Sequence, residues 1–205
     1  MAIYLNKILL FLLLPTLLIA NEIALEKVYE EVLLTYSTIY SYEASFLQIN
    51  YWDEIDVYKS SEGKLYYNKE NLLMDYSQPM GQKLLVEENS MTMYDSVAEQ
   101  AIISNKVEIE IRPDKLISHY WDISKKEFLN QSDDTIKIKL QTPEEEKIVI
   151  TISNKFITEF NIVDINKNYV IYKFSDIRIN KKLPENIFDL TLPEDTSIID
   201  TRNYK

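Results

Sequence analysis

Few side chains in this sequence are arranged for catalysis. His119 is the single histidine. Because it stands next to Tyr120 and Trp121, its position is more typical of a residue on a helix face than of a general base. The absence of cysteine excludes disulfides, thiolate metal sites, thiol catalysis and acylation of the protein's own cysteine. Two glycines in 205 residues cannot form a glycine-rich phosphate loop. No serine lies in a nucleophile-elbow sequence.

The acidic side chains occur in groups, but these groups fall in expected turns. Asp53, Glu54 and Asp56 lie at an expected hairpin tip, and residues 144–146 form a run of three glutamates. Glycoside hydrolysis would need two carboxylates held at a fixed distance, and the acidic pair at 133–134 lacks the loop pattern of a calcium site. We therefore expect no enzymatic activity, no cofactor and no metal site.

Composition and charge narrow the possible partners. The chain has 22 Lys and Arg against 33 Asp and Glu, for a net charge of −11. Nucleic-acid binding depends on clustered basic residues, and no such cluster occurs, so we expect no nucleic-acid partner. The 27% charged and 46% hydrophobic residues are close to globular averages, which excludes a wholly disordered chain.

The N-terminus predicts an export signal. Lys7 precedes an apolar run at 8–20, and the polar residue Asn21 follows. A basic residue, an apolar run of about a dozen and a small residue before a polar start are typical of a secretory signal peptide. The run is shorter than the roughly 20 residues that span a bilayer. Residues 1–20 are thus predicted to be a signal peptide.

Cleavage after Ala20 would leave residues 21–205, which we expect to form a single exported domain. Leu18 occupies a position where a small residue gives a better cleavage signal. An uncleaved N-terminal anchor therefore stays open as an alternative.

Residues 22–40 have the periodicity of an amphipathic helix. Apolar residues recur at steps of three and four, with acidic residues between them. The predicted apolar stripe consists of Leu25, Val28, Tyr29, Val32, Leu33, Tyr36, Ile39 and Tyr40.

From Tyr42 onward the sequence changes to short runs rich in β-branched and aromatic residues. The space between the early runs is too short for crossover helices, so antiparallel hairpins are expected. The first six predicted strands are 41–52, 57–67, 72–76, 83–87, 91–94 and 98–104. Five more follow at 135–141, 147–153, 156–164, 169–175 and 188–192.

Residues 112–129 interrupt the strands. Pro113 and Asp114 suit the beginning of a helix, so we expect a short helix or helical loop inserted here. The fold class is then mainly β (α+β). We predict a single open, strongly curved antiparallel β-barrel of about eleven strands, with the leading helix and the helical insertion covering its concave face.

Alternation of side chains predicts one dry face. Residues 136–140 alternate strictly between apolar and basic, and a curved sheet must cover its apolar concave face with helices or with a ligand. Met74, Met80, Met91 and Met93 lie in or near the central strands. Methionine adapts its shape, which suits variable acyl chains but also fills ordinary cores. Composition alone favours a filled core.

Several segments occur in a recognisable order: 45–48 (Ser-Phe-Leu-Gln), 63–66 (Gly-Lys-Leu-Tyr), 72–79 (Leu-Leu-Met-Asp-Tyr-Ser-Gln-Pro), 83–86 and 91–95. This order resembles the periplasmic outer-membrane lipoprotein carrier family, LolA. Members of that family show a Phe-x-Gln strand, a Gly-x-Leu/Phe strand and an aromatic-rich strand that ends in Tyr-x-x-Pro. Residues 172–180 and 188–193 are similar to the closing strands of the family. No single motif is specific, but the ordered set covers nearly all of the chain after residue 20.

The resemblance implies a non-enzymatic periplasmic carrier that shuttles lipoproteins from the inner to the outer membrane. Acylated lipoproteins would be its cargo, an inner-membrane lipoprotein-releasing transporter its donor and an outer-membrane acceptor its recipient; we expect a monomer. The alternative is an exported adaptor or sensor of the same fold that binds a protein partner. The residues expected to line the apolar cavity and its helical lid are Phe46, Leu65, Tyr67, Met74, Tyr76, Leu85, Met91, Met93, Ile102, Leu116 and Trp121.

The sequence departs from the family at two positions. Many members carry Arg-Pro a few residues after the glycine, and this arginine braces the lid, but residues 67–71 here contain neither arginine nor proline. Lys69 is the nearest cation and the candidate lid latch, although lysine cannot form a planar bidentate fork. Leu73 and Met74 stand where members often have Arg-Trp, which makes this rim more apolar.

Overall fold

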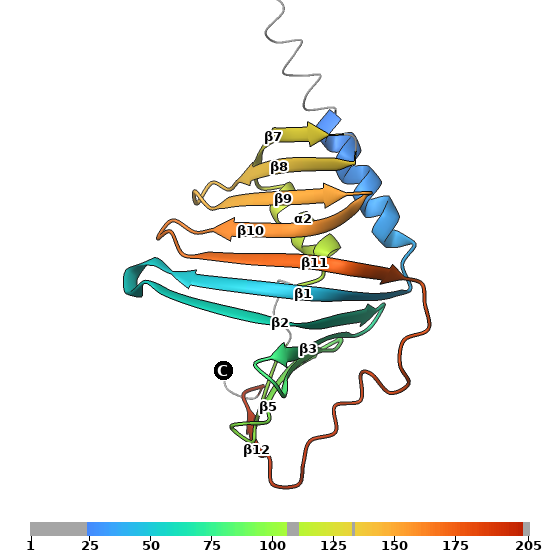
Figure 1. Ribbon diagram of the computed structural model, residues 1–205, viewed down its shortest axis with the longest axis vertical. Helices are drawn as coiled ribbons and strands as arrows, with labels where there is room; N and C mark the ends of the chain where they lie inside the picture. Colours follow the sequence, from blue (N-terminus) through green and yellow to red (C-terminus); the bar gives the residue numbers. More distant parts are fainter. Residues whose placement is uncertain (1–23, 106–110, 133, 203–205) are drawn as a thin grey trace, which may run out of the picture.

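A computed structural model of the chain describes residues 24–105, 111–132 and 134–202. In this part of the chain, twelve strands form one curved, open sheet, with helices on its concave side (Figure 1). The strand order is β12-β6-β5-β4-β3-β2-β1-β11-β10-β9-β8-β7. The predicted open antiparallel sheet is confirmed, whereas the predicted signal peptide lies outside the described residues.

The helices are α1 (residues 24–37), the 3₁₀ helix η1 (Asp53–Ile55) and α2 (Pro113–Trp121). Neighbouring strands pair antiparallel, except that β12 runs parallel to β6. The strands are β1 (Ser41–Trp52), β2 (Val57–Asn68), β3 (Leu72–Gln78), β4 (Gln82–Val86), β5 (Ser90–Asp95), β6 (Gln100–Asn105), β7 (Lys125–Ser132), β8 (Thr135–Gln141), β9 (Lys147–Ser153), β10 (Phe156–Val163), β11 (Tyr169–Ile179) and β12 (Ser197–Asp200).

The helical insertion is shorter than predicted. The prediction extended it to Leu129, but α2 ends at Trp121 and Lys125–Ser132 forms β7. Because β7 is an edge strand with mostly exposed side chains, its sequence lacks the apolar alternation that marks the inner strands.

The last predicted strand is also wrong. Residues 188–192 form no strand, and the final strand is Ser197–Asp200. Both edges of β11 are already paired, with β1 and with β10, so the C-terminal segment has no free neighbour there. It continues past Pro193 to the edge of β6, where it pairs in parallel.

Helix α1 lies across one end of strands β7 to β10 (Figure 1). Its buried residues Leu25, Val32 and Tyr36 belong to the predicted apolar stripe. The hydroxyl of Tyr36 accepts a 3.2 Å hydrogen bond from the backbone N–H of Ile157 in β10. Tyr40 departs from the stripe: it is 58% exposed, because the chain has left the helix at this point.

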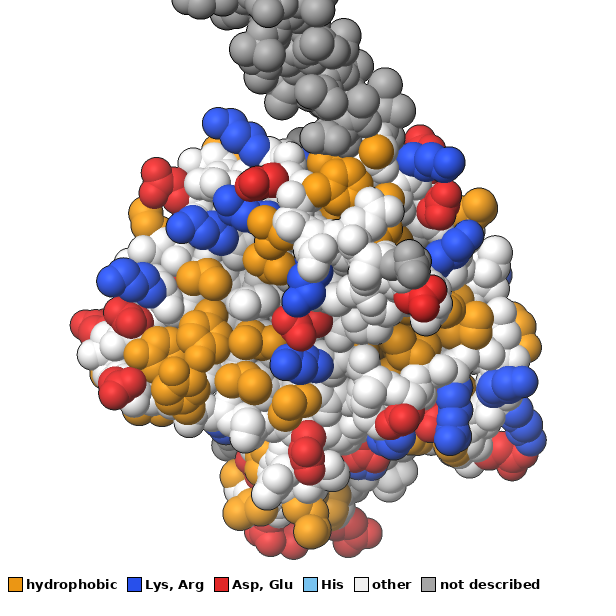
Figure 2. All heavy atoms as spheres, turned by 45° about the horizontal axis from the view of Figure 1, so that its top comes forward, with side chains coloured by type: hydrophobic (Ala, Val, Ile, Leu, Met, Phe, Trp, Pro, Cys, Tyr) orange, Lys and Arg blue, Asp and Glu red, His pale blue; other side chains and the backbone are white. Residues whose placement is uncertain are grey.

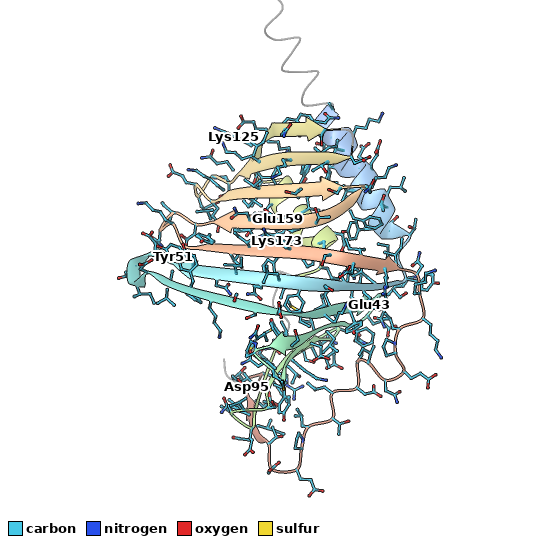
Figure 3. All side chains as sticks on the ribbon, viewed as in Figure 1. Glu43, Tyr51, Asp95, Lys125, Glu159 and Lys173 are labelled. Carbon is cyan, nitrogen blue, oxygen red and sulfur yellow. The ribbon has the colours of Figure 1, made fainter. Side chains whose placement is uncertain are left out.

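Strand register determines which side chains face the helices. Opposed residues in neighbouring strands share a face, and one row of such pairs runs along the concave side from β1 to β6. This concave row consists of Ala44, Leu65, Met74, Leu84, Met93 and Ile102. The convex side carries charged pairs, such as Lys173 with Glu159, whose Nζ and Oε2 atoms lie 3.5 Å apart (Figure 3).

Candidate functional site

Helix α2 covers the concave face of the sheet. Pro113 in its first turn suits a helix start because its missing N–H is not needed there. The negative charge of Asp114 stabilises the same end, which is the positive end of the helix dipole. One side of the helix is buried in the same core as the sheet, whereas Lys115 and His119 are exposed. The buried side chains of α2 that meet the sheet are Leu116, Ile117, Tyr120 and Trp121.

Arg112 holds the N-terminal end of α2 to the sheet. Its guanidinium carbon lies 4.7 Å from the ring centroid of Tyr67 in β2. Its Nε and Nη2 atoms donate to the two carboxylate oxygens of Asp114, at 3.3 and 3.1 Å. These charged side chains are only 19% and 13% exposed, so the cation–π contact is worth about 1–2 kcal/mol rather than the smaller value of an exposed pair. We call Arg112, Asp114 and Tyr67 the N-terminal clamp.

Trp121 holds the other end of α2 to α1. Its ring stacks on Tyr29 with centroids 4.3 Å apart and planes 8° from parallel. Its indole N–H donates to the carboxylate of Glu26, at 3.1 Å from the nearer oxygen. Lys126 approaches the same ring, with its Nζ 5.3 Å from the centroid. We call Trp121, Tyr29 and Glu26 the C-terminal clamp. Helix α2 is therefore held to the sheet at its N-terminal end and to α1 at its C-terminal end.

Two more buried tyrosines, Tyr42 and Tyr36, continue from Tyr67 of the N-terminal clamp into the core. Tyr67 stacks on Tyr42 at 4.4 Å, and Tyr36 lies 6.4 Å from Tyr42. Burial raises the pKa of all three hydroxyls above 10, and the nearby charge of Asp114 raises them further, so they stay protonated at neutral pH. Within the described part of the chain, the hydroxyls of Tyr42 and Tyr67 have no hydrogen-bond partner.

The structure brings most of the predicted cavity residues together. Phe46, Leu65 and Met74 are buried on the concave face, in the same core cluster as Tyr67, Leu116 and Trp121. The ring of Tyr76 packs edge-on against Phe46 at 5.1 Å and is partly buried. Predicted lid and sheet residues therefore meet in one apolar core.

Three further predicted residues extend the concave side into β5 and β6. Met91 is partly buried against the core, whereas Met93 is 45% and Ile102 is 39% exposed. Met93 pairs with Leu84 on one side and with Ile102 on the other. The concave face thus continues as an exposed apolar strip beyond the region that α2 covers.

Leu85 and Lys69 lie elsewhere. Leu85 pairs with Leu73, and both are neighbours in sequence of concave residues, so Leu85 faces the convex side. A shift of one residue in a strand moves a side chain to the opposite face, which is why this position could not be assigned from the sequence. Lys69 is exposed in the turn between β2 and β3.

The prediction missed Arg112. Its signal was present in the sequence, since it directly precedes the Pro-Asp start of an apolar helix and an N-terminal side chain of such a helix lies close to the surface that the helix covers. No local pattern in the sequence indicated that the guanidinium of Arg112 would lie over the ring of Tyr67.

A pocket of about 250 Å³ opens between α1 and the ends of β8 and β9. Val28 and Val32 form its helical wall, and Ile136 and Ile152 form its sheet wall. Glu31 and Lys155 lie at its rim, with Oε2 and Nζ 3.7 Å apart. The pocket gives access from the surface to the apolar side of the sheet.

Within residues 24–105, 111–132 and 134–202, no three His, Asp or Glu side chains gather in a way that would hold a metal ion. None of the helices in this part of the chain is both long and apolar enough to cross a bilayer. The site offers apolar surface, aromatic rings and a short helix held at both of its ends.

Comparison with known proteins identifies the family. The family model for the outer membrane lipoprotein carrier protein LolA matches residues 37–191, which include β1 to β11 and α2. The chain belongs to this family. No curated protein sequence matches the chain significantly.

Two solved structures with TM-scores above 0.5 share the fold at low sequence identity, and a third gives a lower score. An uncharacterized conserved protein from Thermus thermophilus is 10% identical with a TM-score of 0.57, over 86% of this chain and 99% of that one. MucB is 6% identical with a TM-score of 0.57, over 85% of this chain and 64% of its own. A LolA superfamily protein from Nitrosomonas europaea is 10% identical with a TM-score of 0.41, over 80% and 96%.

Proposed function

We propose that this protein is a periplasmic carrier that holds the acyl chains of lipoproteins on its concave face. Helix α2 and the acyl chains would occupy this face in turn. The observation that carries the proposal is the position of α2. Its apolar side chains lie on concave residues such as Phe46, Leu65 and Met74, so outward movement of α2 would uncover an apolar surface without breaking the sheet. Membership of the lipoprotein carrier family supports the same ligand.

Burial of α2 and burial of one acyl chain contribute similar free energies. Burying four apolar side chains of α2 contributes roughly 6–12 kcal/mol, at about 1.5–3 kcal/mol each. An acyl chain of about 14 methylene groups contributes roughly 11 kcal/mol on burial, at about 0.8 kcal/mol per group. Since neither occupant is strongly favoured, one acyl chain can displace α2, and α2 can later displace that chain.

We assign the lid latch to Arg112 rather than to Lys69. Arg112 contacts the sheet through Tyr67 and is oriented by Asp114, whereas Lys69 is exposed in a turn. A planar guanidinium can stack on the ring and fork onto the carboxylate at the same time, which an ammonium cannot. The latch cation therefore comes from the lid and its acceptor ring from the sheet.

The cellular part of the proposal follows the family. Export by residues 1–20 would place the chain in the periplasm, where an inner-membrane lipoprotein-releasing transporter would load it and an outer-membrane acceptor would unload it. Depletion in the native cell tests this role. We expect lipoproteins to accumulate at the inner membrane; unchanged sorting would contradict the carrier function.

Binding by the purified protein tests the site directly. We expect a fluorescent acylated peptide to bind saturably, and Met93→Glu to weaken binding at least tenfold because it places a charge on the exposed concave strip. Val97→Glu is the matched control, since Val97 is also exposed but follows β5 in a turn. If instead a protein partner binds equally well after removal of every acyl group, the adaptor alternative holds.

A further inference from the structure

The convex face of the sheet carries an apolar patch at one end, on the side away from α1 and α2. Tyr51 in β1 is opposite Tyr58 in β2 and opposite Tyr169 in β11, with ring centroids 4.4 and 5.0 Å apart. On a neighbouring rung Ile49 is opposite Ile171. We call these five residues the tyrosine patch; Tyr51 is labelled in Figure 3, and apolar surface gathers at this end of the sheet in Figure 2 (left).

This patch is unusual for its position. The solvent side of an antiparallel sheet is normally polar, and the same face carries the ion pairs Lys173–Glu159 and Lys139–Glu127. Tyr58 is nevertheless 64% exposed, and Tyr51 and Tyr169 are only partly buried. A contiguous exposed group of large apolar side chains marks an interaction surface more often than isolated ones do.

The patch is held in place by its two hairpin tips. The backbone N–H of Asp53 donates to the side-chain oxygen of Asn168 at 3.0 Å, which joins the β1–β2 tip to the β10–β11 tip. Asn168 in turn donates to Asp164 from its backbone and side-chain nitrogens, at 2.9 and 2.8 Å. The Tyr51 hydroxyl donates to Asp56 at 3.2 Å. A surface fixed in this way loses little entropy when a partner binds.

The two hairpin tips give the surface a net negative charge. Four carboxylates lie on the tip segments 50–60 and 161–170, against two lysines. The acidic residues are Asp53, Glu54, Asp56 and Asp164.

Two tyrosines of the patch, Tyr51 and Tyr169, have raised pKa values. A hydrogen bond with Tyr58 and the nearby tyrosines raise the pKa of Tyr169 to about 12, and partial desolvation together with Asp56 and Asp53 raises the pKa of Tyr51.

We propose that the tyrosine patch and the acidic hairpin tips form a docking site for a protein partner, apolar at the centre of its contact face and carrying Arg or Lys where it meets the tips. Tyr and Trp are the residue types that dominate protein interfaces, and an apolar centre with a charged rim is the usual arrangement of such interfaces. The acidic tips disfavour an anionic membrane surface, and a second copy would present the same acidic tips. The proposal does not depend on the carrier function.

Photo-crosslinking and titration test the docking site. A benzoylphenylalanine at position 58 is expected to crosslink, in the native cell, to one protein that the same residue at position 40 does not reach. Tyr40 is a matched control because it is 58% exposed and lies at the end of the sheet where β1 begins. The crosslinked protein is then purified and titrated against the unlabelled chain.

We expect Tyr58→Ser and Tyr169→Ser each to weaken this binding at least tenfold and Tyr40→Ser to leave it unchanged. Asp53→Asn combined with Asp56→Asn should weaken it and reduce its dependence on salt. Three results would overturn the proposal: crosslinks from position 58 only to a second copy of this chain, equal crosslinking from positions 58 and 40, or flotation with phosphatidylcholine or phosphatidylglycerol vesicles that is lost in Tyr58→Ser. Circular dichroism melts verify that each variant is folded.

Discussion

At the scale of single residues, Arg112 has the largest consequence for the site. It precedes α2, stacks on a sheet tyrosine and is oriented by a carboxylate in the first turn of the helix. Each of these contacts uses the planar shape of the guanidinium as well as its charge. A single side chain therefore couples the beginning of the lid helix to the concave face of the sheet.

Replacing Arg112 should loosen α2 without unfolding the sheet. We expect Arg112→Lys and Arg112→Ala to raise hydrogen exchange of the α2 amides about five- to thirtyfold, because a contact worth about 1–2 kcal/mol is lost. Exchange of the β9 amides is the internal control and should stay unchanged. Equal protection of α2 in the wild type and in both variants would show that the N-terminal clamp does not hold the helix.

Gly63 is required by a close approach of two backbones. A Cβ at this position would lie 2.1 Å from the carbonyl oxygen of Asp75 in β3, next to the register shift between Glu62 and Gly63. We expect Gly63→Ala to lower the free energy of unfolding in urea by about 1–3 kcal/mol, since strands β2 and β3 must separate. Ser60→Ala on the exposed part of β2 is the control and should change it by less than about 0.5 kcal/mol.

At the scale of elements, α2 is a short helix whose stability depends on its two clamps and on one buried face. Nine residues are too few for a stable isolated helix. Its attachment points lie on different elements, Tyr67 in β2 and Tyr29 in α1. Movement of α2 away from the sheet therefore requires the loss of both clamps and the exposure of its buried side. It does not require any strand pairing to break.

The absence of cysteine allows this opening to be measured with one introduced thiol. Leu116 lies on the buried side of α2 and Ile138 lies in β8, and their side chains are 4% and 0% exposed. Each is replaced by cysteine in a separate variant, Leu116→Cys and Ile138→Cys. We expect a thiol reagent to modify Cys at 116 at least tenfold faster than at 138, because local opening of α2 requires less free energy than global unfolding. Identical rates at the two positions would mean that α2 opens only with the whole protein.

At the scale of the whole molecule, many tyrosines surround or enter the core, and their hydroxyls link stability to alkaline pH. Burial raises the pKa of Tyr172 to about 12, against an ordinary value of 10, and raises those of Tyr36, Tyr42 and Tyr67 as well. The unfolded chain then loses protons first as pH rises above 10, so unfolding is favoured.

The free energy of unfolding is accordingly expected to be constant below about pH 9.5 and to fall between about pH 10 and 12. Tyr172→Phe should have a shallower fall, because one of the linked protons is absent. Urea unfolding at half-unit steps of pH measures both curves. Parallel curves for the wild type and Tyr172→Phe would contradict the assigned environment of Tyr172.

The sequence by itself determined most of the elements that form the sheet and its two covering helices. Periodicity located β8 and β9 to the residue, and the Pro-Asp pair located the beginning of α2, because these signals depend on neighbours within a few positions. It also indicated a set of apolar residues that mostly gather on one face.

Only the tertiary structure decided how these elements meet. Leu85 turned to the convex side, β12 paired with β6, Arg112 reached Tyr67, and three strands brought Tyr51, Tyr58 and Tyr169 together. Each of these contacts joins residues on different elements, and strand register changes the face of every side chain when it shifts by one residue. Because register is fixed by pairing and packing over the whole sheet, no local pattern contains it.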